Sequence, residues 1–204
     1  MKNLFTSLFL ISASALFISQ CNTPDTNSDA VLNPLSSKTA DYNGYASQEQ
    51  WGEHLVTICG CNDCHTPKKF VNGMMLLDSS RLLSGHPSEL PPPDVNRSEL
   101  EKKGNVVTQT LTAWSGPWGT SFTGNLTSDP TGIGNWDESN FITAIRHGKF
   151  KGIESGRSLL PPMPWEMYRN MTDRELKAVF AFLKSTKPVQ NVVPATLPPV
   201  SASH

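Results

Sequence analysis

The run Cys61-Asn62-Asp63-Cys64-His65 combines residue types and a spacing that can do chemistry. Two thiols three positions apart lie about one helical turn apart, so both can reach the two vinyl groups on one edge of a porphyrin. His65 directly follows the second thiol and can present its imidazole to the iron. This spacing is typical of c-type haem attachment. The run therefore predicts one covalent haem c, bound through Cys61 and Cys64, with His65 as an iron ligand.

Two other functions can use a pair of cysteines at this spacing. A redox dithiol is expected within a βαβ pattern, and none surrounds the run. A zinc site needs a second pair of Cys or His residues at ligand spacing, and none follows. Cys59, two positions before Cys61, faces away from it on a helix. A small buried residue is the favoured interpretation of Cys59, and a reactive thiol is the alternative.

Met163 lies in the proline-rich run Leu160-Pro161-Pro162-Met163-Pro164-Trp165. Each proline fixes its own φ, and Pro164 also restricts Met163 to an extended conformation. A stiff loop can hold a thioether sulfur in place, so we predict that the haem iron is bound by His65 and Met163. His86 is the best alternative ligand. The weaker competitors are Met74, Met75, Met167, Met171, His54 and His147, and we expect Met74 and Met75 to pack in the core with Leu76 and Leu77.

The N-terminus carries Lys2 and then an apolar run, residues 4–18. This run is shorter than the roughly 20 residues that a membrane-spanning helix needs, so residues 1–20 are predicted to be a signal peptide. The residues before Cys21 resemble the lipobox of bacterial lipoproteins, although Gln20 replaces the usual small residue. We therefore predict an exported lipoprotein, anchored through Cys21 in the cell membrane or outer membrane, with the haem domain in the periplasm. Ordinary cleavage nearby and an uncleaved anchor are the alternatives.

The composition fits one modest domain. The 204 residues are 37% hydrophobic and 17% charged with a formal charge of −1, and this charge gives no reason to expect nucleic acid as a partner. Residues 21–46 are polar and are predicted to form a flexible tether. The cytochrome c domain is predicted over residues 47–188, and residues 189–204 form an extended, proline-rich tail.

Three helices are predicted to position the chemical groups. They begin after Ser47, Asp137 and Thr172, each of which can cap a helix N-terminus, and the second ends at Gly148. The apolar residues at helical spacing that we expect in the core are Trp51, Leu55, Ile58, Phe141, Ala144, Ile145, Leu176, Val179, Phe180 and Leu183. Residues 66–135 show little periodicity. An all-α fold is therefore expected, with about three main helices and long loops around one haem.

Six short motifs, in this order, carry a family resemblance. They are Gly60-Cys61-Asn62-Asp63-Cys64-His65-Thr66-Pro67, Leu83-Ser84-Gly85-His86-Pro87, Asn125-Leu126-Thr127, Thr131-Gly132-Ile133-Gly134-Asn135-Trp136, Pro161-Pro162-Met163-Pro164-Trp165 and Thr172-Asp173. Together they resemble the cytochrome c domains related to the haem subunits of bacterial membrane-bound alcohol and sugar dehydrogenases, over about residues 50–194. Those subunits carry three such domains, whereas this chain has one CxxCH run.

The resemblance implies an all-α cytochrome c fold, His/Met ligation of the iron and electron transfer. It implies redox proteins as partners, such as a dehydrogenase, other cytochromes or a terminal oxidase. No Ser/His/Asp set or acid–base pair suggests separate catalysis, so an electron carrier is expected and not an enzyme. The alternative is a haem enzyme or a gas or redox sensor in which Met163 can be displaced from the iron.

Overall fold

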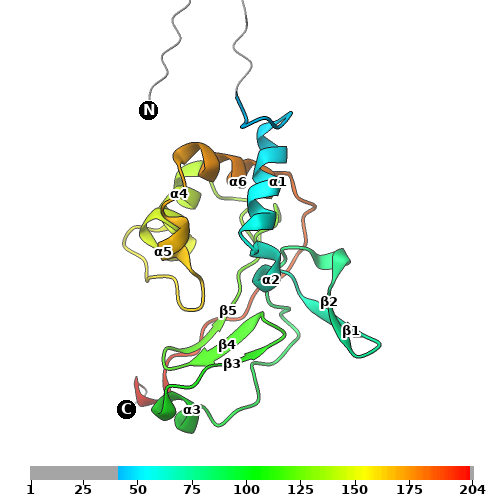
Figure 1. Ribbon diagram of the computed structural model, residues 1–204. Coiled ribbons are helices and arrows are strands. Elements are labelled where there is room, and N and C mark those ends of the chain that lie inside the picture. Colours follow the sequence, from blue (N-terminus) through cyan, green and yellow to red (C-terminus); the bar gives the residue numbers. More distant parts are fainter. Residues whose placement is uncertain (1–40, 203–204) are drawn as a thin grey trace, which may run out of the picture. The chain divides into compact units, whose positions relative to one another are not determined.

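The computed structural model describes residues 41–202, and Figure 1 shows their arrangement. The helices are α1 (Gln48–Ile58), α2 (Cys61–His65), α3 (Arg97–Lys103), α4 (Glu138–His147), α5 (Trp165–Tyr168) and α6 (Asp173–Ser185). The short 3₁₀ turns are η1 (Ser79–Arg81), η2 (Phe150–Gly152) and η3 (Val200–Ala202). The strands are β1 (Lys68–Val71), β2 (Met74–Leu77), β3 (Val107–Gln109), β4 (Ala113–Gly116) and β5 (Gly119–Phe122).

The three predicted helices are confirmed as α1, α4 and α6, and their caps explain where they begin. Ser47 accepts a hydrogen bond from the backbone of Gln50, and Asp137 and Thr172 each form a complete capping box. These bonds satisfy N–H groups that the first helical turn leaves without partners. Helix α4 ends at Gly148, which has the left-handed conformation common at helix C-termini.

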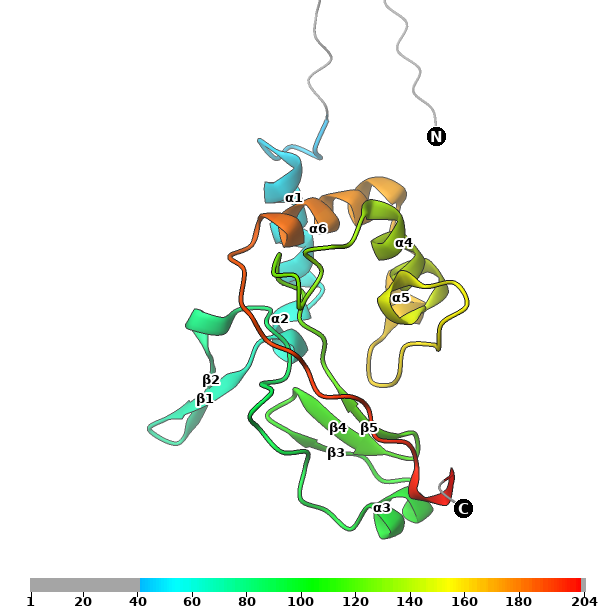
Figure 2. The same ribbon diagram turned by 180° about the vertical axis from the view of Figure 1, so that it is seen from behind.

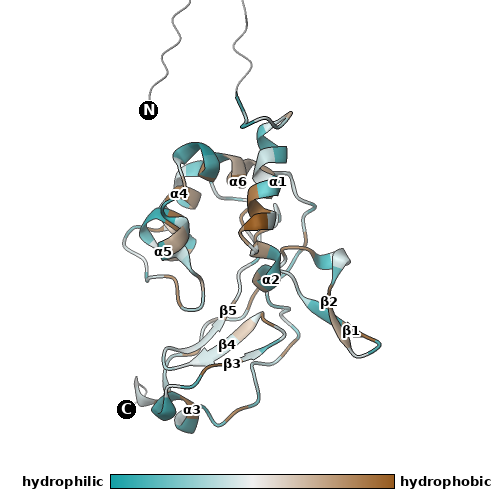
Figure 3. Ribbon diagram, viewed as in Figure 1, coloured by the Kyte–Doolittle hydropathy of each residue, from teal (hydrophilic) through white to brown (hydrophobic). Residues whose placement is uncertain are grey.

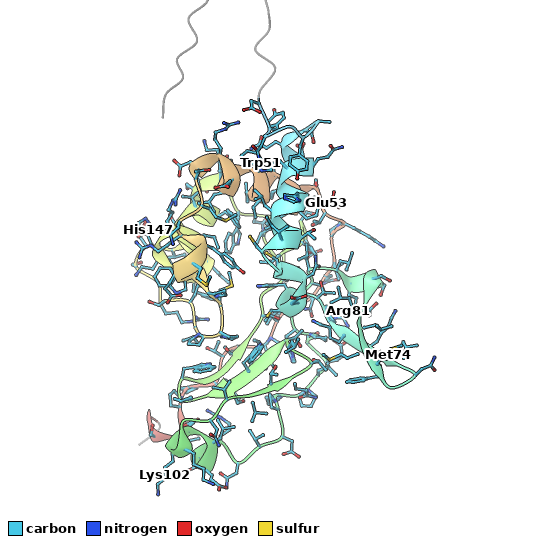
Figure 4. All side chains as sticks on the ribbon, viewed as in Figure 1. Trp51, Glu53, Met74, Arg81, Lys102 and His147 are labelled. Atoms are coloured by element: carbon cyan, nitrogen blue, oxygen red, sulfur yellow. The ribbon has the colours of Figure 1, made fainter. Side chains whose placement is uncertain are left out.

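The hydrophobic core lies where α1 crosses α6, with α4 beside them. Trp51 and Leu55 of α1 are buried against Leu176, Val179 and Leu183 of α6 in one apolar cluster, and Figure 4 labels Trp51 at this crossing. Gly52 allows the two helices to approach closely, because a Cβ there would overlap the backbone of Ala178. The prediction that Ile58 lies in the core is wrong, because Ile58 is 63% exposed and Val56 is buried instead. Figure 3 shows the apolar stretch at this end of α1, just before α2.

The expected all-α fold is wrong, because the described residues also form two antiparallel sheets. Strands β1 and β2 make a hairpin, and β3, β4 and β5 make a three-stranded sheet in that order. The fold is therefore mixed, with helices and small sheets. Each strand has only three or four residues, which is too short for an alternating pattern to stand out in the sequence.

The β1–β2 hairpin projects from the rest of the described chain, as Figures 1 and 2 show from opposite sides. The expected burial of Met74, Met75, Leu76 and Leu77 is wrong, because all four are between 41% and 58% exposed. Figure 4 places Met74 near the tip of the hairpin, away from the helices. A two-stranded hairpin has no third layer to cover its faces, which explains the exposure.

After α6, the chain returns along the three-stranded sheet towards α3, where Figure 2 shows it as the orange and red segment. Asn191 is buried in this segment, Leu197 bridges to Thr120 of β5, and the backbone of Val200 donates to the Glu101 carboxylate of α3. The segment is thus held to the domain at several points. Among residues 41–202, no helix is long and apolar enough to cross a membrane.

Candidate haem-binding site

The two cysteines of the CxxCH run lie on the one-turn helix α2, which begins after the left-handed residue Gly60 (φ 66°). The thiols of Cys61 and Cys64 are free and partly buried. Burial raises the pKa of Cys61 to about 12 and also raises the pKa of Cys64. The two sulfurs lie one helical turn apart, which is the spacing that attachment to two vinyl groups needs.

The His65 ring is fixed by a hydrogen bond from its Nδ1 to the backbone carbonyl of Gly124, at 2.8 Å. A carbonyl can only accept, so Nδ1 carries the proton and Nε2 is left with a free lone pair. Burial is the largest influence on His65 and lowers its pKa, which favours the neutral ring. A neutral imidazole whose other nitrogen donates to a carbonyl is the usual form of a metal-binding histidine.

Two further segments meet at His65: one lies within the resemblance motif that contains Gly85, and the other, at Gly124, directly precedes the motif that begins at Asn125. The backbone N–H of Gly85 donates to the His65 carbonyl at 2.7 Å. The segments around Gly85 and Gly124 also pair with each other through their backbones. The N–H of His86 donates to the carbonyl of Thr123, and the N–H of Leu126 donates to the carbonyl of Leu83. Together with the bond from His65 to Gly124, these contacts join segments up to 59 positions apart in the chain.

Tyr168 connects the Met163 region with the cysteine run. Its hydroxyl donates to the carbonyl of Cys59 at 2.7 Å. Burial first, and then the nearby thiols of Cys61 and Cys59, raise the pKa of Tyr168 to about 12. Tyr168 ends α5, which directly follows the proline-rich loop, so the hydroxyl ties that loop to the CxxCH run.

Met163 is partly buried and packs against the hydrophobic core, as Cys61 also does. Its backbone N–H donates to Leu160, and its carbonyl accepts from Trp165. Trp165 in turn lies against Gly148, where a Cβ would overlap its indole ring. The loop is therefore held by α4 as well as by its own prolines.

The alternative ligand His86 is engaged elsewhere. It is fully buried, its Nδ1 lies 2.9 Å from the Thr112 hydroxyl, and its Nε2 lies 3.2 Å from the Leu90 carbonyl. Since both ring nitrogens have hydrogen-bond partners, neither is free to bind a metal. His86 is better explained as a structural residue that packs against Phe122, with the two ring centroids 4.9 Å apart.

The remaining competitors are no better placed. His54 stacks against Tyr45, and His147 is the last residue of α4, where Figure 4 labels it. Met167 is 72% exposed, whereas Met171 packs against the core and so makes a useful control. Over residues 41–202, no group of three or more Cys, His, Asp or Glu side chains is suited to hold a metal ion. The predicted lipidation site, Cys21, lies outside the described residues.

No family model matches the chain. Relatives are nevertheless found among dehydrogenase subunits. The chain is 40% identical over 75 residues to the cytochrome c subunit of a quinone-dependent alcohol dehydrogenase from Komagataeibacter europaeus, which is 36% of this chain and 15% of the relative. It is 36% identical over 86 residues to the fructose dehydrogenase cytochrome subunit of Gluconobacter japonicus, covering 41% of the chain and 17% of the relative.

A third relative is one of the subunits of the nicotinate dehydrogenase of Pseudomonas putida, with 40% identity over 80 residues, or 39% of the chain and 6% of that protein. The chain thus spans less than a fifth of the length of each of these relatives. The resemblance to cytochrome subunits of dehydrogenases, inferred from the six motifs, is therefore confirmed, at modest identity and over part of the chain.

Several residues of the site were missed in the sequence. Gly124 and Tyr168 act through a backbone carbonyl and a distant hydroxyl, and no spacing rule indicates such contacts. Gly85 carried a signal, because it lies within a resemblance motif. Its φ of +79°, a conformation that favours glycine, explains why a glycine stands there.

Proposed function

We propose that this chain carries single electrons through one c-type haem, bound covalently by Cys61 and Cys64. The observation that carries the proposal is the His65 ring, neutral and oriented by Gly124, directly beside two free thiols on one helical turn. The haem iron would supply the redox chemistry by accepting and releasing one electron. The named relatives support this function, since they include cytochrome c subunits of dehydrogenases.

The chain's own residues have separate tasks in this proposal. The two thiols would hold the haem covalently, and Gly124 holds the His65 imidazole in one orientation and one tautomer. Met163 is proposed as the second axial ligand, presented by a loop with little conformational freedom left to lose. Two ligands that the fold holds in place would keep the structural change on electron transfer small, which suits a carrier.

The attachment is tested with matched cysteine variants of the full chain, produced in a bacterium that matures c-type cytochromes. Mass spectrometry of the wild type should show one added haem, retained after acid–acetone extraction. Cys61→Ala and Cys64→Ala should each lose this double attachment, whereas Cys59→Ala should keep it. Haem that is fully extractable from the wild type, or loss caused by Cys59→Ala alone, would contradict the proposal.

The alternative, a haem enzyme or gas sensor with a displaceable Met163, is separated from a carrier by carbon monoxide. The reduced wild-type protein should resist carbon monoxide if Met163 stays on the iron. Rapid formation of a carbon monoxide complex in the wild type would favour the sensor or enzyme. No contact in the described residues favours that alternative at present, because Met163 packs against the core.

A dehydrogenase is proposed as the electron donor, because the relatives are named as subunits of such enzymes. Attachment to a membrane through Cys21 is proposed from the sequence alone. Labelling with a fatty-acid analogue should mark the wild type and leave Cys21→Ala unlabelled. An unlabelled, soluble wild type would leave an ordinary cleaved signal peptide as the better explanation.

A further inference from the structure

Asn191 is a buried amide in the C-terminal segment, beyond the predicted end of the haem domain. Only 3% of the residue is exposed. Its Nδ2 donates to the carbonyls of Ser84 and His86, at 2.7 and 2.9 Å, and its Oδ1 accepts from the backbone of Ser88 at 3.0 Å. Both N–H donors of the amide and its oxygen therefore have partners in this loop, which fixes the loop strongly.

The two carbonyls that Asn191 binds flank Gly85, whose N–H donates to the backbone carbonyl of His65. Gly85 also lies directly on the backbone of Gly124: a Cβ at Gly85 would come within 2.6 Å of the Gly124 carbonyl carbon. Gly124 is the residue whose oxygen orients the His65 ring. Asn191 thus holds the strip of backbone that presses against the orienting carbonyl.

A second amide binds the same C-terminal segment from the other side. Asn125 follows Gly124 directly, is 6% exposed, and donates from Nδ2 to the carbonyl of Val189 at 2.8 Å. The backbone N–H of Asn191 donates to the Thr131 hydroxyl, which also accepts from Asn125. Residues 189–191 therefore bridge the Gly85 segment and the Gly124 segment, and we call them the C-terminal brace.

We propose that Asn191 is a positioning residue for the haem ligand His65, acting through the C-terminal brace to keep the Gly124 carbonyl on Nδ1. This inference rests on the proposed haem function. A strong hydrogen bond from Nδ1 makes the imidazole a more basic ligand and favours ferric over ferrous iron. Loosening the brace therefore weakens this bond and raises the midpoint potential of the haem.

The test is Asn191→Ala in the full-length, haem-loaded protein, with Asn140→Ala as the matched control. Asn140 also uses its amide structurally, in the capping box of α4, where its side chain binds the backbone of Asp137 and not the His65 region. Both variants should unfold at lower temperature than the wild type. Only Asn191→Ala should raise the midpoint potential and shift the paramagnetic NMR signals of the His65 ring.

Asn191→Gln should bring the midpoint potential and the His65 NMR signals back towards those of the wild type, because glutamine keeps the amide donors on a side chain that is one methylene longer. If Asn191→Ala gives no folded haem protein, Asn191→Ser takes its place with the same expectations, since its hydroxyl can still make one of the bonds. An unchanged potential and unchanged His65 signals, with only a loss of stability, would overturn the positioning role. A wild type without covalent haem would instead overturn the proposed function itself, and this inference with it.

Discussion

The two sides of the proposed haem site are held in different ways. On the His65 side, the ring and the backbone are fixed by hydrogen bonds from segments far away in the sequence. On the Met163 side, prolines stiffen the local backbone, and two side-chain hydrogen bonds tie it to the rest of the domain, from Tyr168 to Cys59 and from Ser121 to Pro161. The first side depends on backbone pairing between distant segments, whereas the second combines local stiffness with side-chain contacts. Damage to each side should therefore have different consequences.

Removing the His65 ligand should have the largest effect, because the hydrogen-bonded side orients the group that anchors the iron. His65→Ala should weaken the hold on the iron by more than the roughly 10- to 100-fold in affinity that loss of an outer-shell partner typically costs a metal site, so little haem protein should be recovered. The yield is measured from the haem absorbance per mole of purified chain. A yield close to that of the wild type would show that His65 is not the anchoring ligand.

Removing Met163 should leave the haem in place but change its chemistry. Thioether sulfur favours ferrous iron, so Met163→Ala should lower the midpoint potential, abolish the weak sulfur-to-iron absorption at the red end of the ferric spectrum and admit carbon monoxide. Met171→Ala is the control, since Met171 is also partly buried and packed against the core. If Met171→Ala produces these changes and Met163→Ala does not, the ligand has been assigned to the wrong methionine.

Two glycines with the same φ of +79° can show how tightly the His65 side is packed. Gly85→Ala adds a Cβ against the Gly124 backbone, whereas Gly73→Ala at the hairpin turn meets nothing within 4 Å. The left-handed conformation alone costs about 1–2 kcal/mol for a non-glycine residue, and the overlap should add about 1–3 kcal/mol to Gly85→Ala. Denaturant unfolding measures both variants, and equal losses would mean that the close approach contributes nothing.

The smallest effect is expected from the tie between the two sides. Tyr168→Phe removes the hydroxyl that donates to Cys59 and keeps the ring. The free energy of unfolding should fall by about 1 kcal/mol, the usual net value of one hydrogen bond. The midpoint potential should be unchanged, because the hydroxyl binds the Cys59 backbone and not the His65 ring nitrogens. A shift in potential would mean that the two sides are coupled through this bond.

Much of the helical part could be predicted because its signals are local. Ser47, Asp137 and Thr172 lie beside the N–H groups that they cap, and the apolar residues of α6 recur at helical spacing. The hairpin was missed, although Asn72-Gly73 is a strong turn signal, with Phe70-Val71 before it and apolar β2 after it. The contact between His65 and Gly124 could not be predicted, because a backbone carbonyl 59 positions away has no sequence signature. For the same reason, nothing in the sequence indicated that Asn191, beyond the predicted domain boundary at residue 188, binds the loop that contains His86.

The position of Asn191, far beyond the CxxCH run in the sequence, also sets an order of synthesis. A ribosome completes the CxxCH run on the order of 100 residues before it reaches Asn191, an interval of roughly ten seconds at about 5–20 residues per second. During that time the carbonyls of Ser84 and His86 lack the Asn191 amide, so the loop beside His65 is without these two hydrogen bonds. The chain therefore contains its cysteines and His65 well before it contains the amide that fixes the neighbouring loop.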